Sequence, residues 1–97
     1  MNTPDIFVVS AARTAIGTFG GSLKDVPLAD LATTAVKAAL ERAAVDPALV
    51  GHLVMGNVIP TETRDAYISR VAAMNAGIPK ETPAYNVNRL CGSGLQA

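Results

Sequence analysis

The strongest constraint on the fold is a run of small apolar side chains at helical spacing between positions 27 and 44. The apolar positions are Leu28, Leu31, Ala32, Ala35, Val36, Ala39, Leu40 and Ala43. Charged residues such as Lys37 occupy the opposite side, a pattern typical of an amphipathic helix with one buried face. Pro27 suits the first turn, and Asp46 before Pro47 ends the helix, because a residue preceding proline avoids helical geometry. The sequence therefore predicts a helix whose alanine-rich face packs closely on a neighbouring element.

Three strand-like runs lie on either side of this helix. Residues 5–12 contain the sequence IFVV, which is apolar on both faces, as in a strand buried inside a sheet. Residues 52–59 and 84–89 are the second and third candidates. Gly56 and Asn57 indicate a bulge or a close backbone approach near the end of the second strand.

The segments between these strands complete the predicted architecture. A glycine-rich loop is expected over residues 13–22, and a second helix over 63–75 with Thr63 as its cap. The order strand, loop, helix, strand, helix, strand predicts a layered α/β domain with a mainly parallel sheet. A core built from 97 residues is marginal alone, so we expect the chain to be part of something larger.

Composition excludes several classes of partner. Eight basic and eight acidic residues cancel to zero net charge, so there is no electrostatic footprint for nucleic acid or an anionic membrane surface. A single cysteine forms no internal disulfide, and no Cys/His spacing typical of a metal site occurs. No secretory or transit segment and no membrane span is evident, and we expect a cytoplasmic protein.

That single cysteine, Cys91, lies in the segment NVNRLCGSGLQA. At the point where a strand gives way to a helix, free backbone N–H groups favour the thiolate and can hold the oxyanion formed when it attacks a carbonyl. Gly92 and Gly94 leave room for a substrate. The alternative is a buried structural cysteine, and the spacing alone leaves both open.

Other candidate residues have simpler interpretations. Ser93 does not fit the G-x-S-x-G pattern of hydrolases and is expected to begin a helix. His52, the only histidine, is expected to have a surface or structural role. The charged residues at 62, 64 and 65 are expected to form a solvated cluster at a helix start. The polar residues at 86, 88 and 89 fit either a polar strand face or an interface.

Three segments resemble the amino-terminal part of a thiolase, of the bacterial acetyl-CoA acetyltransferase or β-ketothiolase type. They are Ser10 to Val26 (SAARTAIGTFGGSLKDV), Gly56 to Ile59 (GNVI) and, most specifically, Asn86 to Ala97. The resemblance implies a layered α/β/α fold and acyl transfer between coenzyme A thioesters, in condensation or thiolysis, without metal or prosthetic group. It implies a place in fatty acid metabolism or polyhydroxyalkanoate biosynthesis.

The resemblance also assigns roles to residues and partners. Cys91 would be the acyl-accepting nucleophile, with its backbone N–H in an oxyanion hole, and Leu90 and Gly92 would lie next to the substrate. Leu90 fits a plain core role equally well. The third strand would meet its two-fold mate in a homodimer or homotetramer.

Thiolases are several-fold longer, and their activating histidine and second cysteine would lie beyond Ala97. Residues 1–97 are therefore expected to be the first part of an incomplete domain, inactive without the remaining thiolase polypeptide. A second hypothesis is a non-catalytic α/β fragment that only packs against a partner chain, with Cys91 buried and inert. A redox-sensing thiol is weaker, since the chain offers no resolving cysteine.

Overall fold

The predicted long helix is present in the computed structural model, which describes residues 2–97. Helix α1 spans Leu28–Ala43, with Pro27 immediately before it. Its predicted apolar face is buried or half-buried throughout, while Lys37 and Glu41 are exposed. The helix closes at Ala44, whose N–H donates to the carbonyls of Glu41 and Leu40. Its left-handed backbone (φ 52°) directs the next N–H, that of Val45, back to the Leu40 carbonyl (3.0 Å). Sequence periodicity therefore located both ends of this helix to within a residue.

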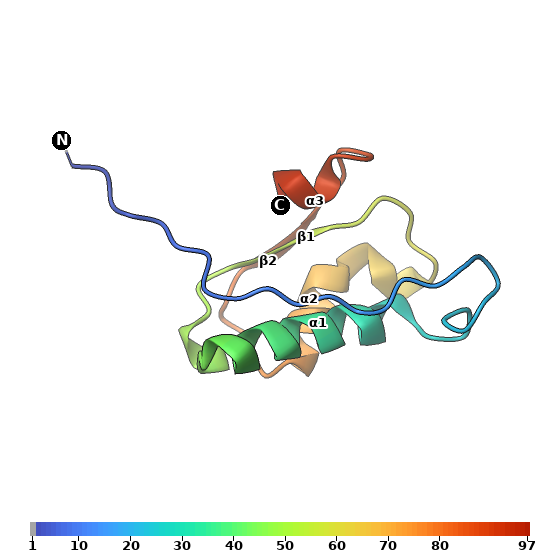
Figure 1. The fold of residues 1–97 in the computed structure, drawn as a ribbon, viewed down its shortest axis with the longest axis horizontal. Helices are drawn as coiled ribbons and strands as arrows, with labels where there is room; N and C mark the ends of the chain where they lie inside the picture. Colours follow the sequence, from blue (N-terminus) through green and yellow to red (C-terminus); the bar gives the residue numbers. More distant parts are fainter. Residues whose placement is uncertain (1) are drawn as a thin grey trace.

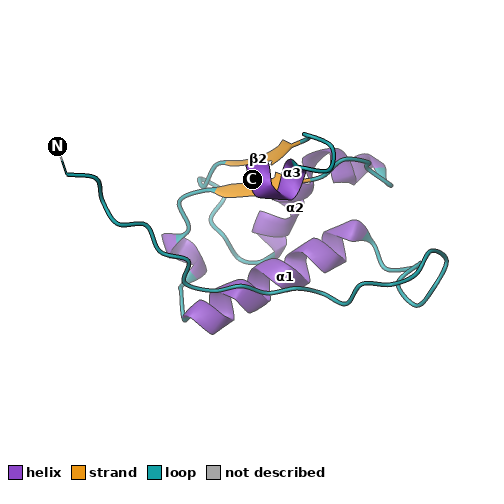
Figure 2. Cartoon of the chain, turned by 45° about the horizontal axis from the view of Figure 1, so that its top comes forward, coloured by secondary structure: helices purple, strands orange, loops and turns teal. Residues whose placement is uncertain are grey.

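Two of the three predicted strands form a parallel pair (Figure 2). Strand β1 spans Leu53–Gly56 and strand β2 spans Ala84–Val87, with Leu53 opposite Ala84 and Gly56 opposite Val87. Both are shorter than predicted. A 3₁₀ turn, η1 (Pro47–Leu49), leads from α1 toward β1. The parallel arrangement confirms the predicted direction of the sheet.

The second helical segment begins differently from the prediction. A 3₁₀ turn, η2 (Thr63–Tyr67), leads into helix α2 (Ile68–Asn75). The residue at the N-cap of η2 is Glu62, which forms a capping box with Asp65, so Thr63 as cap was wrong. The Asp65 carboxylate, three positions after Glu62, accepts a hydrogen bond from the Glu62 backbone amide (2.9 Å), which makes Glu62 the cap.

Asp65 corrects a second expectation, that the charged residues near this helix start are solvated. Its side chain is only 1% exposed. One carboxylate oxygen, Oδ2, accepts hydrogen bonds from the Thr61 hydroxyl (2.7 Å), the Thr61 amide (2.8 Å) and the Glu62 amide (2.9 Å). These bonds, above all that from the Thr61 hydroxyl, lower the pKa of Asp65 below its ordinary value, against the opposing effect of burial.

Helix α2 lies at the centre of the molecule, between α1 and the sheet (Figure 1). The buried apolar residues are Ala29, Ile68, Ala72, Ala73, Ala76 and Ile78. Most are alanines, which let the two helices approach closely. Asn86 on β2 fastens the sheet to α2, because its side chain accepts from the Ser69 amide (3.0 Å) and donates to the Ala66 carbonyl (2.8 Å). This member of the polar run therefore has an internal partner.

The predicted first strand, residues 5–12, is not formed. Residues 2–27, here called the arm, contain turns but neither helix nor strand, and Figure 1 shows them passing α1 and then leaving the body of the molecule. Ile6 and Val8 are 91% and 92% exposed. Such a run requires a hydrogen-bonding neighbour and cover on both faces, whereas here Arg42 ties it to the body by donating a hydrogen bond to the Ala11 carbonyl (2.9 Å).

Candidate active site

Cys91 lies just beyond the carboxyl ends of the two parallel strands. The ends meet at the pair Gly56 and Val87, and the Asn57 amide donates to the Val87 carbonyl (3.1 Å) just past that pair. Residues 88–90 then connect β2 to Cys91. In α/β proteins ligands bind at this edge of a parallel sheet. The topology therefore places the one thiol where such folds place their sites.

Two overlapping turns carry Cys91. The Gly92 amide donates to the Arg89 carbonyl (3.1 Å), and the Ser93 amide to the Leu90 carbonyl (3.0 Å). Leu90, immediately before Cys91, has φ 49° and is therefore left-handed. This conformation costs a residue with a Cβ about 1–2 kcal/mol. Nothing in the sequence indicates it, because glycine and asparagine are the residues usual in that region.

Side chains on both sides of Leu90 hold the turn. The Ser93 hydroxyl accepts from the Arg89 amide (2.8 Å) and donates to the Leu90 carbonyl (2.7 Å). Asn88 accepts from the Leu90 amide (3.0 Å) and donates to the Val58 carbonyl (3.2 Å) in the segment after β1. Each such bond contributes about 0.5–1.5 kcal/mol net, so together they offset the backbone strain. Sequence analysis gave neither residue this part.

Gly56 confirms the predicted close backbone approach. A Cβ at this position would lie 2.7 Å from the Ser93 carbonyl carbon and 2.8 Å from the Gly94 nitrogen. The end of β1 thus abuts the backbone that follows Cys91, and only glycine fits. At Gly94, by contrast, an added Cβ would have nothing within 4 Å.

The side chains of Leu90 and Cys91 face solvent. Cys91 is a free thiol and is exposed within residues 2–97. Leu90 is 69% exposed, which excludes a core role within residues 2–97. The predicted helix after Cys91 is present but short: α3 spans Ser93–Gln96, with Gly92 at its cap. Ser93 begins it as predicted, and its hydroxyl is buried beneath the turn.

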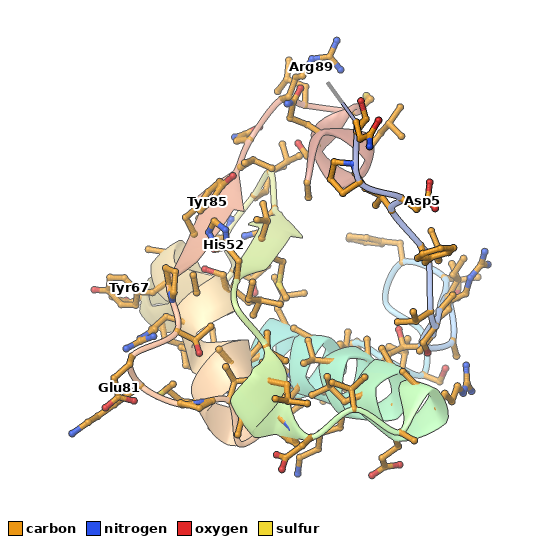
Figure 3. The ribbon with its side chains drawn as sticks, turned by 90° about the vertical axis from the view of Figure 1, so that its left-hand side faces the viewer. Asp5, His52, Tyr67, Glu81, Tyr85 and Arg89 are labelled. Atoms are coloured by element: carbon orange, nitrogen blue, oxygen red, sulfur yellow. The ribbon has the colours of Figure 1, made fainter. Side chains whose placement is uncertain are left out.

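His52 lies at the other end of the sheet. It precedes β1, is exposed, and its ring packs on that of Tyr85 at a centroid distance of 5.0 Å (Figure 3). The length of β1, about 13 Å at 3.3 Å per residue, separates it from the edge that bears Cys91. This confirms a surface role. Over residues 2–97 the structure brings no histidine beside the thiol.

Two further searches cover the same residues. Positions 2–97 hold no group of three or more His, Cys, Asp or Glu side chains able to bind a metal ion. None of the helices in this part of the chain has the length and apolar character needed to cross a membrane.

Comparison with known proteins identifies the class. Residues 6–97 match the thiolase N-terminal domain family, and the chain belongs to it. It is 61% identical over 95 residues to a β-ketothiolase, BktB, of Cupriavidus necator, and 48% identical over 92 residues to the human mitochondrial 3-ketoacyl-CoA thiolase. These alignments include 98% and 95% of this chain but 24% and 23% of the relatives. The chain therefore spans about a quarter of their length.

The fold agrees with solved thiolases. The crystal structure of human mitochondrial 3-ketoacyl-CoA thiolase in complex with CoA matches with a TM-score of 0.90 at 49% identity. The match covers 93% of this chain and 23% of that one. A Bacillus anthracis acetyl-CoA acetyltransferase structure matches with a TM-score of 0.85 at 39% identity. The predicted thiolase-like α/β fold is thereby confirmed.

Proposed function

We propose that residues 1–97 supply the nucleophile of a thiolase, which transfers acyl groups between coenzyme A thioesters. One observation carries the proposal. In a chain 61% identical to a β-ketothiolase, the only thiol is free and exposed on a hydrogen-bonded turn at the carboxyl edge of the sheet. An accessible thiol on a fixed turn meets the first geometric requirement for a nucleophile.

The proposed reaction has two halves. The Cys91 thiolate attacks the carbonyl carbon of an acyl-CoA, and the carbon–sulfur bond to CoA breaks. The departing CoA thiolate takes up the proton that Cys91 gave up and leaves as the free thiol. A second acetyl-CoA then loses an α-proton, and its carbanion attacks the Cys91 thioester to give a 3-ketoacyl-CoA and free Cys91. The Cys91 N–H is proposed to help hold the oxyanion, with Leu90 and Gly92 beside the acyl group. No metal or prosthetic group takes part.

The remaining groups are proposed to come from further thiolase polypeptide. The reaction needs a base for the thiol and an acid/base for the α-carbon, and each missing role costs about 10² to 10⁴ in rate. His52 is too distant to serve as either. A relative carrying CoA in its crystal structure supports CoA as substrate. A cytoplasmic homodimer or homotetramer is the proposed assembly.

The test begins with the native polypeptide that carries these residues, purified from its host. Intact masses are taken before and after brief exposure to acetyl-CoA, and any added mass is mapped by peptide digestion. We expect a species longer than 97 residues with one acetyl group on the peptide that contains Cys91.

The alternative, a non-catalytic fragment, gives a different result. It predicts a 97-residue species whose Cys91 reacts with iodoacetamide, because the thiol is exposed, but gains no acetyl group from acetyl-CoA. That outcome would overturn the proposed function.

A further inference from the structure

Resting on the proposed function, we propose that Ser93 and Asn88 are positioning residues for Cys91. Their side chains hold Leu90 in its left-handed conformation and so set the direction in which the next side chain leaves the backbone. The two residues act through Leu90 and need not touch substrate themselves.

Ser93 is the stronger of the two supports. Its side chain is 4% exposed, so water does not compete for the hydroxyl. That one hydroxyl joins the residues before and at the strained position, accepting from the Arg89 amide and donating to the Leu90 carbonyl. The backbone of Ser93 also abuts Gly56 at the end of β1, which leaves that backbone little room to shift toward the strand.

Asn88 anchors the turn to the rest of the molecule. Its side chain accepts from the Leu90 amide and donates to the Val58 carbonyl, linking the turn to the segment after β1. Both bonds are exposed, so water competes with them. We therefore expect Asn88 to contribute less than Ser93.

The central experiment measures acylation of Cys91 in a single turnover with acetyl-CoA, using the full-length native polypeptide. A displacement of about 1 Å at a reacting atom costs up to about 10²-fold in rate. We expect Ser93→Ala to slow acylation by about 10- to 100-fold and Asn88→Ala by about 3- to 10-fold. The affinity for CoA should stay within about 3-fold, because the CoA site is not displaced.

Two matched controls separate positioning from folding. Ser69→Ala removes an equally buried serine in α2, and Asn75→Ala removes an exposed asparagine at its end. Both should leave acylation unchanged. The rate of alkylation by iodoacetamide, a small reagent that approaches from any side, should change by less than about 3-fold in every variant, since positioning matters only for an oriented substrate.

A double-mutant cycle tests the route through Leu90. Glycine adopts a left-handed backbone about as readily as a right-handed one, so Leu90→Gly removes the conformational cost that the hydrogen bonds of Ser93 offset. We expect Ser93→Ala to slow acylation by less than about 5-fold in the Leu90→Gly background. An equal loss in both backgrounds would overturn the inference.

The outcomes distinguish this inference from the function on which it rests. If the unsubstituted protein never acetylates Cys91, the proposed function fails and the inference fails with it. If the unsubstituted protein acetylates normally and Ser93→Ala does so at the same rate, only the inference fails. If acylation and alkylation fall together with the folded fraction, Ser93 is merely structural and the inference is again wrong.

Discussion

The arm and the Cys91 turn are both irregular segments that helices and strands cover only in part, yet they differ in what holds them in place. The turn, residues 88–93, is fixed by hydrogen bonds among its own residues and by contact with β1. The arm exposes Ile6 and Val8 almost fully. Local hydrogen bonds fix the backbone conformation of the turn from its own residues, whereas a strand is formed only when a neighbouring strand is present to pair with it.

The difference separates two contributions that we propose for this chain. In the proposed function the turn supplies the nucleophile, and its backbone shape is already fixed by hydrogen bonds. The arm provides apolar surface, and its apolar side chains require cover that residues 2–97 do not provide. Substitutions in the turn should therefore change reactivity, and substitutions in the arm should change stability in the longer protein.

The largest effect is expected from Cys91→Ser. It should lower acetyl incorporation by at least about 10⁴-fold, because the nucleophile of a catalytic set is lost. The free energy of unfolding should change by no more than about 0.5 kcal/mol, since the side chain is exposed. Quantitative mass spectrometry and urea unfolding measure the two. If the Cys91→Ser variant were still acetylated, at another residue, the turn would not be the reactive part of the chain and would not differ from the arm in reactivity.

The next effect concerns the arm. In the full-length polypeptide, Val8→Asp should destabilise by about 3 kcal/mol or more, because a strand apolar on both faces would bury the new carboxylate. In the 97-residue chain the same change should cost no more than about 0.5 kcal/mol, since Val8 is 92% exposed. Thermal and urea unfolding of both forms measure the costs.

Thr3→Asp is the matched control for this substitution, because it adds the same charge to an exposed polar position of the arm. It should be neutral in both forms. Equal effects of Val8→Asp in the long and short forms would show that the arm gains no cover and would break the comparison.

The arm also shows where sequence reasoning stopped. The pattern of residues 5–12 predicted burial on both faces, yet Ile6 and Val8 are 91% and 92% exposed, because burial in a sheet depends on strands that the pattern does not contain. Helix α1 was predictable, because its periodicity and its proline signals are local. Asp65 was mistaken for a solvated charge, because its burial depends on hydrogen bonds from backbone amides, which the types of residue at 62, 64 and 65 do not reveal.

The candidate site was predictable in part. The Cys91 motif indicated a thiol just before a helix start, and Gly56 indicated a close approach in the second strand. The left-handed Leu90 and its two supporting side chains were not predictable, because leucine has no preference for that conformation. Backbone strain of this kind becomes visible only in three dimensions.

A smaller effect is expected where the turn meets β1. Gly56→Ala would place a Cβ 2.7 Å from the Ser93 carbonyl carbon, so the backbone after Cys91 must move. We expect the free energy of unfolding to fall by about 1–3 kcal/mol, as is typical of overpacking, and acylation of Cys91 to be slower. Gly51→Ala is the matched control, because an added Cβ there has nothing within 4 Å. Equal stability and acylation in the two variants would show that β1 does not brace the turn.

The smallest effect concerns Asp65, which stabilises the start of η2 by hydrogen bonds as local as those of the turn. Its pKa is lowered in the folded protein, chiefly by the Thr61 hydroxyl, from an ordinary value of 3.8. The stability that this carboxylate contributes is therefore complete above pH 3.8 and is lost as the pH falls through the lower, folded pKa. Asp65→Asn should lower the melting temperature at neutral pH, and its difference from the unsubstituted protein should narrow in acid.

Asp25→Asn serves as the control for this pH dependence, because Asp25 is an exposed residue of the arm. Its melting temperature should follow that of the unsubstituted protein at every pH. A melting temperature for Asp65→Asn that runs parallel to the unsubstituted curve down to pH values well below 3.8 would show that the carboxylate is not held by its hydrogen bonds. Local hydrogen bonds would then be too weak to fix a segment by themselves, and the contrast drawn between the Cys91 turn and the arm would lose its basis.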